Sequence, residues 1–255
     1  MSTPASEEPA STGAKVYCIG LSRTGTTSIC QALEVLGYRT LHFSMELFVQ
    51  PELISPELHY EPMAPLGASW RWERQNVVNI IRARVDPDIF DKYDAMGDVP
   101  IPLFYRELDR KFPGSKFIHT VRDEARWLKS MKWMYEEGSV LWKHGVLDDE
   151  LKYQTYGTMT YDPDLMLKAY RAHNAEVTEY FKDRPQDLLH FDLSSAPPNY
   201  EQLCLFLGKP LPTTPFPVSN ESRTASWIAK LVHRVGTLPF YGTVARSVLS
   251  LIRMR

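Results

Sequence analysis

Two glycines and several hydroxyl side chains near the start of the chain have the spacing of a phosphate-binding loop. Residues 20–28 read Gly-Leu-Ser-Arg-Thr-Gly-Thr-Thr-Ser, and Gly20 and Gly25 match the two glycines of the Walker A pattern. Thr26 replaces the lysine of that pattern, while Arg23 supplies a positive charge three residues earlier. Because backbone amides at a helix start attract anions, the loop predicts a phosphate-bearing ligand that is held without the Walker lysine.

Two more polar residues follow predicted strands, where ligands of α/β folds bind. Arg122 comes directly after the run Lys-Phe-Ile-His-Thr-Val and can contact such a ligand. The other interpretation is that Arg122 and Asp123 form only an ion pair and a helix cap. Asp98 precedes Val-Pro, and it is either part of the same site or the cap of a helix that begins at Pro100.

Alternating strand and helix patterns must position these residues. Strands are predicted at 15–19, 39–43, 93–96, 116–121 and 188–193. Helices are predicted at 27–36, 69–84, 100–112, 123–135, 162–182 and 200–207. This alternation favours an α/β fold in which helices flank a parallel β-sheet on both faces, a three-layer sandwich of the P-loop NTPase type. Ligands of such folds bind beyond the carboxyl ends of the strands, where the 20–28 loop, Asp98 and Arg122 all fall.

Length and composition indicate one large α/β domain. The chain has 255 residues, 44% of them hydrophobic, and its net charge of −2 gives no reason to expect nucleic acid as a partner. The sequence contains no Cys/His cluster that would predict a metal site. Cys18, Cys30 and Cys204 stand apart in apolar contexts, which indicates reduced, buried thiols of an intracellular protein. Residues 1–14 lack the apolar core of a signal peptide and are predicted to be disordered.

The predicted α/β domain covers residues 15–222, and a basic, apolar-rich tail follows it at 223–255. The tail has helical apolar spacing and only basic charges, and Gly236 and Pro239 divide it into two helices too short to span a membrane. Such a tail either packs against the domain or makes a peripheral contact with an anionic membrane through residues 227–255.

Three motifs resemble those of the sulfotransferases, enzymes that transfer a sulfuryl group from 3′-phosphoadenosine 5′-phosphosulfate (PAPS) to an acceptor. The first is the loop at 20–28, and the second is Lys-Phe-Ile-His-Thr-Val-Arg-Asp at 116–123 with Trp-Leu-Lys-Ser at 127–130. The third covers residues 206–220, which begin with Phe-Leu-Gly-Lys-Pro and end with Asn220. They occur in the family's order between residues 15 and 220. The resemblance implies a cytoplasmic, PAPS-dependent sulfotransferase that needs no metal and releases 3′-phosphoadenosine 5′-phosphate (PAP).

The resemblance also implies a role for each site residue. The loop would hold the 5′-phosphosulfate through Arg23, Thr24, Gly25, Thr26, Thr27 and Ser28. Arg23 matches the family's usual catalytic lysine, and Arg122 and Ser130 would hold the 3′-phosphate. Asp98 would accept the proton of the acceptor. A carboxylate with an ordinary pKa of about 3.9 is a weak base, which suffices if the proton leaves late in the reaction or if burial raises the pKa.

Two features depart from the family pattern, and two other functions stay open. Ser28 stands where a tryptophan often stacks on adenine, and the family's Arg-Lys-Gly segment is absent, so Arg223 is either its substitute or a solvated basic residue. The expected acceptor is a hydroxyl or amine of a small molecule or lipid. One alternative is a small-molecule kinase that binds magnesium-ATP, against which Thr26 argues. The other is a catalytically silent nucleotide-binding or membrane-adaptor protein.

Histidines and aromatic residues allow plainer interpretations. His42 and His119 lie in strand patterns and are expected to be packed or surface residues rather than catalysts. Residues 136–160 have no firm period and are predicted to be an irregular surface segment, the place where a lid is expected. Aromatic side chains that either line an acceptor pocket or simply pack are Trp70, Trp72, Trp133, Tyr135, Trp142, Tyr153 and Tyr156.

Overall fold

The described part of the chain is built around a sheet of five parallel strands. The computed structural model describes residues 14–42, 89–136, 146–192 and 199–218 of the 255-residue chain. The strands are β1 (Val16–Cys18), β2 (Thr40–His42), β3 (Ala95–Gly97), β4 (Lys116–Val121) and β5 (Leu188–Asp192). They lie in the order β2-β3-β1-β4-β5, and neighbouring strands run parallel.

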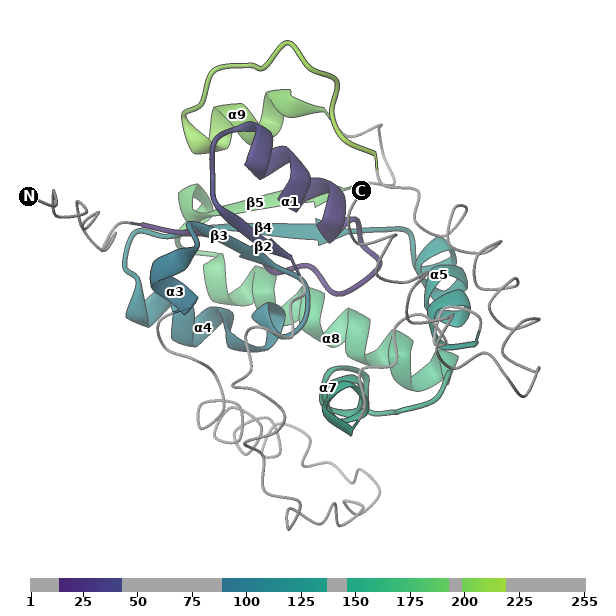
Figure 1. Ribbon diagram of the computed structural model, residues 1–255. Helices are drawn as coiled ribbons and strands as arrows, with labels where there is room; N and C mark the ends of the chain where they lie inside the picture. The colour runs from purple at the N-terminus through teal and green to yellow at the C-terminus, as the bar shows by residue number, and fades with distance from the viewer. Residues whose placement is uncertain (1–13, 43–88, 137–145, 193–198, 219–255) are drawn as a thin grey trace, which may run out of the picture.

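Helices cover both faces of this sheet (Figure 1). They are α1 (Thr26–Val35), α3 (Ile89–Lys92), α4 (Ile101–Lys111), α5 (Glu124–Glu136), α7 (Val146–Tyr156), α8 (Pro163–Phe181) and α9 (Tyr200–Leu207), with a short 3-10 helix, η3 (Pro185–Asp187). Side chains alternate along β1, so that Val16 and Cys18 pack with α1 and α9, whereas Tyr17 packs with α4 and α8. This arrangement confirms the predicted α/β fold with helices on both faces of a parallel sheet.

The strand order creates a topological switch point between β1 and β3. The chain leaves β1 into α1 on one face of the sheet, and it leaves β3 into α4 on the other. In open parallel sheets, ligands bind beyond the carboxyl ends of the strands, at the point where two neighbouring strands send their connections to opposite faces. The loop after β1 and Asp98 after β3 border this point, and Arg122 follows the neighbouring strand β4.

The predicted elements agree with the structure in type, with one exception among the described residues. β4 has the bounds that were predicted for it. The irregular segment predicted at 136–160 was wrong for residues 146–156, which form α7. Leu151 and Tyr156 of this helix are buried, so packing against the rest of the domain stabilises a helix that has only a weak periodic pattern of its own.

Several predicted segments lie outside the described residues. These are residues 1–13, the helix at 69–84, the domain boundary at 222 and the tail at 223–255 with its expected membrane contact. Among the helices that the structure describes, none is both long and apolar enough to cross a membrane. The three cysteines are buried and free of disulfides, as predicted.

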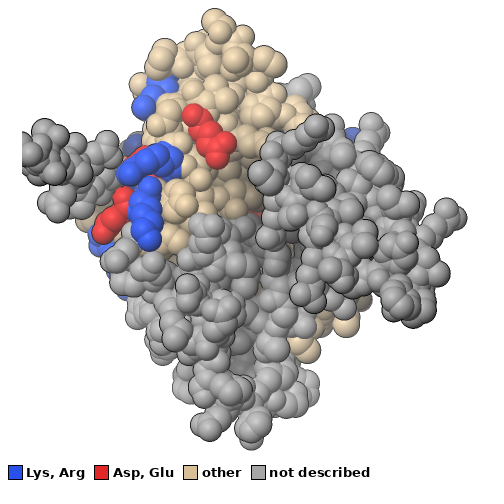
Figure 2. Space-filling view, viewed as in Figure 1, with Lys and Arg blue, Asp and Glu red and all other residues tan. Residues whose placement is uncertain are grey.

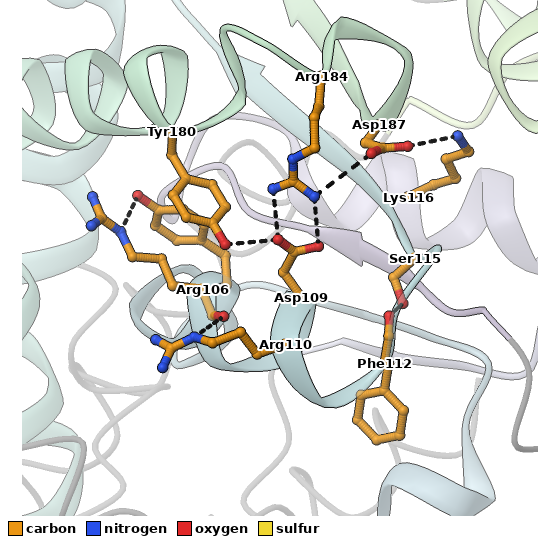
Figure 3. Close-up of polar contacts among 10 residues, drawn as sticks. Arg106, Asp109, Arg110, Phe112, Ser115, Lys116, Tyr180, Arg184 and Asp187 are labelled. Atoms are coloured by element: carbon orange, nitrogen blue, oxygen red, sulfur yellow. Dashed lines mark hydrogen bonds and ion pairs between the residues drawn. The ribbon is translucent and has the colours of Figure 1, made fainter.

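A network of polar side chains connects the start of β4, the end of α8 and η3 with α4 (Figure 3). Asp109 of α4 accepts hydrogen bonds from the Arg184 guanidinium (Nη2–Oδ2 2.6 Å) and from the Tyr180 hydroxyl (2.7 Å). Lys116, the first residue of β4, pairs with Asp187 of η3 at 3.1 Å. These contacts lie at the amino end of β4, opposite the carboxyl ends of the strands, and therefore stabilise the fold rather than bind a ligand.

Candidate active site

The loop between β1 and α1 takes its shape from close packing against β4. A Cβ atom at Gly20 would lie 1.8 Å from Oγ1 and 2.6 Å from the carbonyl oxygen of Thr120, so only glycine fits there. Thr24 is fully buried, and its Oγ1 donates to the carbonyl of Leu21 at 2.6 Å and lies 2.6 Å from Thr120 Oγ1. Gly25 has a φ of 94° and precedes the first residue of α1. The loop is therefore fixed from inside, and the hydroxyl of Thr24 belongs to that internal support.

Helices α5 and α8 hold the same loop from the other side. The indole Nε1 of Trp127 donates to the carbonyl oxygen of Ser22 at 3.0 Å. The Trp127 ring stacks on Tyr170 of α8, with the centroids 4.3 Å apart. The Tyr170 hydroxyl accepts from the amide of Arg122 and donates to its carbonyl, both at 2.8 Å. One aromatic stack thus fixes both the loop and the residue that follows β4.

Asp98 connects the carboxyl ends of β3, β1 and β2. It has a φ of 68°, and only 13% of its side chain is exposed. Oδ1 accepts from Ser22 Oγ at 2.5 Å and from the Val99 amide at 2.7 Å. Oδ2 accepts from Thr26 Oγ1 at 3.2 Å and lies 3.3 Å from His42 Nε2. The carboxylate therefore has partners on the loop, on β2 and on its own backbone.

These partners keep Asp98 charged. Burial alone would raise the pKa of Asp98, but the hydrogen bond and charge of His42, together with the hydrogen bonds from Ser22 and Val99, outweigh it and hold the pKa below its ordinary value. Burial therefore does not make Asp98 a stronger base, because its pKa is lowered rather than raised. The capping role is not observed either, because Pro100 is the cap residue of α4 and no side chain caps this helix.

Positive charge gathers on the other side of the loop. Arg23 has a φ of 70°, its Nε donates to Ser130 Oγ at 2.9 Å, and its guanidinium lies over the Trp133 ring at 5.3 Å. Arg122 Nη1 donates to the carbonyl of Arg23 at 3.3 Å. The structure thus brings Arg23, Arg122 and Ser130 together, although they are up to 107 residues apart in the sequence.

The electrostatics of this cluster favour an anion. The pKa of Arg122 is lowered, first by burial and then by the charges of Arg23 and Arg126, and Asp123 only partly offsets this. Cations that raise one another's energy in this way are stabilised by a bound negative group. In the described part of the chain, no group of His, Cys, Asp and Glu side chains could hold a metal ion.

Comparison with known proteins shows the family to which the chain belongs. The family model of the sulfotransferase domain matches residues 15–225. The chain belongs to the sulfotransferase domain family. Over 118 residues it is 30% identical to "Ava biosynthesis cluster protein M" of Aspergillus versicolor, a match that spans 46% of this chain and only 42% of that protein. A crystal structure of a sulfotransferase from Alicyclobacillus acidocaldarius aligns with 87% of this chain and 93% of its own chain, at 14% identity and a TM-score of 0.41.

The sulfotransferase domain brings most of the predicted site residues to one place. Thr26 and Thr27 open α1, and their hydroxyls lie 3.2 and 3.1 Å from His42 Nε2. Ser28 is buried within the first turn of α1, so its side chain offers no surface for a stacking contact. Arg223 lies outside the described residues, as do Trp70, Trp72 and Trp142.

Two residues of the sulfotransferase site escaped the sequence interpretation. His42 was expected to be a packed or surface residue, yet it faces Asp98 from the end of β2. The signal was available, because His42 lies at the carboxyl end of a strand predicted to be parallel to the one before the loop. Trp127, which belongs to a family motif, proves to hold the loop through Ser22. His119, in contrast, is buried in β4 as predicted.

Proposed function

We propose that this domain transfers the sulfuryl group of PAPS to a hydroxyl or amine of a small-molecule or lipid acceptor, giving PAP and a sulfated product. The observation that carries the proposal is the placement of a charged carboxylate, Asp98, and an arginine pair, Arg23 and Arg122, on two sides of one loop. Membership of the sulfotransferase domain family supports the same reaction class. The cytoplasmic location expected from the sequence is part of this proposal.

The residues present fit a donor with two phosphate groups. PAPS supplies the activated sulfuryl group and a phosphate that can leave with its charge. The amides at the start of α1, with the side chains of Thr26 and Thr27, would hold the 5′-phosphosulfate. Arg122 and Ser130 would hold the 3′-phosphate, whose charge offsets the crowding that lowers the pKa of Arg122.

Arg23 links these two halves of the donor site. In the structure its guanidinium hydrogen-bonds Ser130, a proposed ligand of the 3′-phosphate, while its backbone lies in the loop proposed for the phosphosulfate. A guanidinium stays protonated at any working pH, so Arg23 would stabilise the negative charge on the departing phosphate.

Asp98 would accept the proton of the acceptor. Its lowered pKa makes it a weak base, which is sufficient when the proton leaves late, after most of the bond to the departing phosphate is broken. Its Oδ2 faces His42 Nε2, and the hydrogen bond and positive charge of His42 stabilise the ionised carboxylate that accepts the proton. In this proposal Asp98 accepts the proton, and His42 holds the carboxylate in place from the end of β2.

Binding calorimetry with PAP and with magnesium-ATP tests the donor. We expect binding of PAP without metal, and Arg122→Ala should weaken it, whereas Arg110→Ala, which removes an exposed arginine of α4, should not. Preference for magnesium-ATP would support the kinase instead. Labelled PAPS with a panel of hydroxyl and amine acceptors then tests transfer, which Arg23→Ala should abolish. Undiminished transfer by the Arg23 variant would contradict the assigned chemistry.

A further inference from the structure

The hydroxyl group of Tyr156 is a buried polar group at the site that the proposed mechanism leaves without a role. Tyr156 ends α7 and is 2% exposed. Its electrostatic neighbours include Ser22, Asp98 and Arg23. The hydroxyl lies beside Ser22, but among the described residues it has no hydrogen-bond partner of ordinary geometry. A buried hydroxyl without a partner costs free energy, which a bound ligand can recover.

Packing holds this hydroxyl in place. The Tyr156 ring contacts Trp127 at a centroid distance of 6.2 Å and meets Tyr135 edge-on at 6.5 Å. Trp127 also binds the carbonyl of Ser22, so the same indole fixes both the loop and the ring beside it. The position of the Tyr156 hydroxyl relative to the loop is therefore set before any ligand arrives.

The hydroxyl remains a hydrogen-bond donor throughout the working pH range. Burial raises the pKa of Tyr156 far above its ordinary value, the negative charge of Asp98 adds to this, and the nearby Ser22 and Arg23 only partly oppose it. A neutral O–H group in this position suits an anionic oxygen, because it offers a proton without losing it.

We propose that the Tyr156 hydroxyl donates a hydrogen bond to an oxygen of the sulfuryl group that is transferred. This inference rests on the proposed function. There, Arg23 and the loop bind the donor and Asp98 faces the acceptor, so the sulfuryl group passes between them. Tyr156 has Arg23 of the donor side and Asp98 of the acceptor side among its electrostatic neighbours. It positions the group through a hydrogen bond, and no covalent bond or proton transfer involves Tyr156.

A second buried tyrosine, Tyr17, has a similar hydroxyl group but lies in the core, away from the loop. The hydroxyl of Tyr17 is also buried and without a hydrogen-bond partner in the described part of the chain. Its surroundings are the rings of Phe112 and Phe117 in the core, and burial is the cause of its raised pKa. Tyr17→Phe therefore makes the same chemical change away from the loop and serves as a matched control for Tyr156→Phe.

Comparing PAP with PAPS isolates the sulfuryl group, because the two nucleotides differ only in that group. Calorimetry without acceptor should show that Tyr156→Phe binds PAP as the wild-type protein does but binds PAPS roughly 10- to 100-fold more weakly, the usual effect of losing a hydrogen bond to a charged group. Tyr17→Phe should bind both nucleotides normally. Phenylalanine keeps the ring contacts, and thermal unfolding of each variant checks that the fold is retained.

Each other result of this experiment overturns the assignment. Equal weakening of PAP and PAPS would mean that Tyr156 only supports the loop. Unchanged binding of PAPS, with or without a higher KM for the acceptor, would mean that the Tyr156 hydroxyl makes no hydrogen bond to the sulfuryl group. If the wild-type protein bound neither nucleotide, the proposed function itself would fail and this inference with it, a result distinct from a defect confined to Tyr156→Phe.

Discussion

Acid should destabilise this domain through one buried histidine, His119 of β4. Its Nε2 lies 3.0 Å from Asn174 Oδ1, and its Nδ1 lies 3.3 Å from His190 Nδ1. An amide oxygen can only accept, so Nε2 carries the proton of His119 and Nδ1 accepts from His190. A second proton on His119 would set two N–H groups against each other. Burial, followed by the charge of His190, lowers the pKa of His119 from 6.5 to about 4, and the bond to Asn174 opposes this only in part.

The sign and size of the effect follow from this pKa. The unfolded chain binds a proton at His119 near pH 6.5, whereas the folded protein does so only near pH 4. Stability that is fully present above pH 6.5 is therefore lost as the pH falls toward 4. At about 1.36 kcal/mol per pH unit, the difference between the two pKa values corresponds to roughly 3 kcal/mol as an upper figure.

Urea unfolding between pH 7.5 and 4.5 measures this loss. His119→Gln keeps a side-chain donor for Asn174 and cannot titrate, so its free energy of unfolding should fall less over this range, by on the order of 2–3 kcal/mol. His190→Gln removes the partner, whose ring is more exposed, and should change the slope less. Parallel pH profiles for the wild-type protein and His119→Gln would refute the reasoning.

Three further predictions concern the site and its loop. Asp98→Asn keeps the size of the side chain but removes the proton acceptor, so kcat should fall about 10²- to 10⁴-fold with little change in PAP affinity; turnover and calorimetry measure the two, and a normal kcat would dismiss Asp98 as the base. Arg122→Ala should weaken PAP binding by about 1.5–3 kcal/mol, and an effect on kcat alone would argue against its assigned place. Gly20→Ala should destabilise the fold by about 2–3 kcal/mol or more, because the new Cβ would lie 1.8 Å from Thr120 Oγ1. Gly37→Ala meets no atom within 4 Å and has only its φ of 89° to strain it, so urea unfolding should show a smaller loss of about 1 kcal/mol.

Local signals were strong enough to predict most of the framework. β4 could be bounded from Lys116 to Val121 because its apolar run ends at charged residues on either side. The loop and α1 could be placed because Gly20 and Gly25 fix both ends of a short turn. The meeting of Arg23 with Arg122 followed from a topological rule, since the carboxyl ends of parallel strands share one edge of the sheet.

What sequence could not supply was the direction of individual side chains. Thr24 sits among hydroxyl residues that resemble phosphate ligands, yet its side chain points into the protein toward Thr120. The strand-end position of His42 placed it near the site, but only its contact with Asp98, more than fifty residues later, shows where its side chain points. Tyr156 belonged to a segment without clear period, and only its packing on Trp127 reveals where it points. In each case a contact distant in sequence decides the role.

The left-handed backbone at Arg23 and Asp98 has a consequence for engineering this domain. A non-glycine residue in that conformation costs of order 1 kcal/mol or more, which glycine would avoid. At position 98 this gain is outweighed, because glycine would also remove the carboxylate that accepts hydrogen bonds from Ser22 and Thr26. A library screened for heat resistance alone would therefore admit glycine more readily at position 23 than at position 98. Selection for stability and selection for turnover should diverge at Arg23, which supplies the cation of the proposed chemistry, and should agree at Asp98.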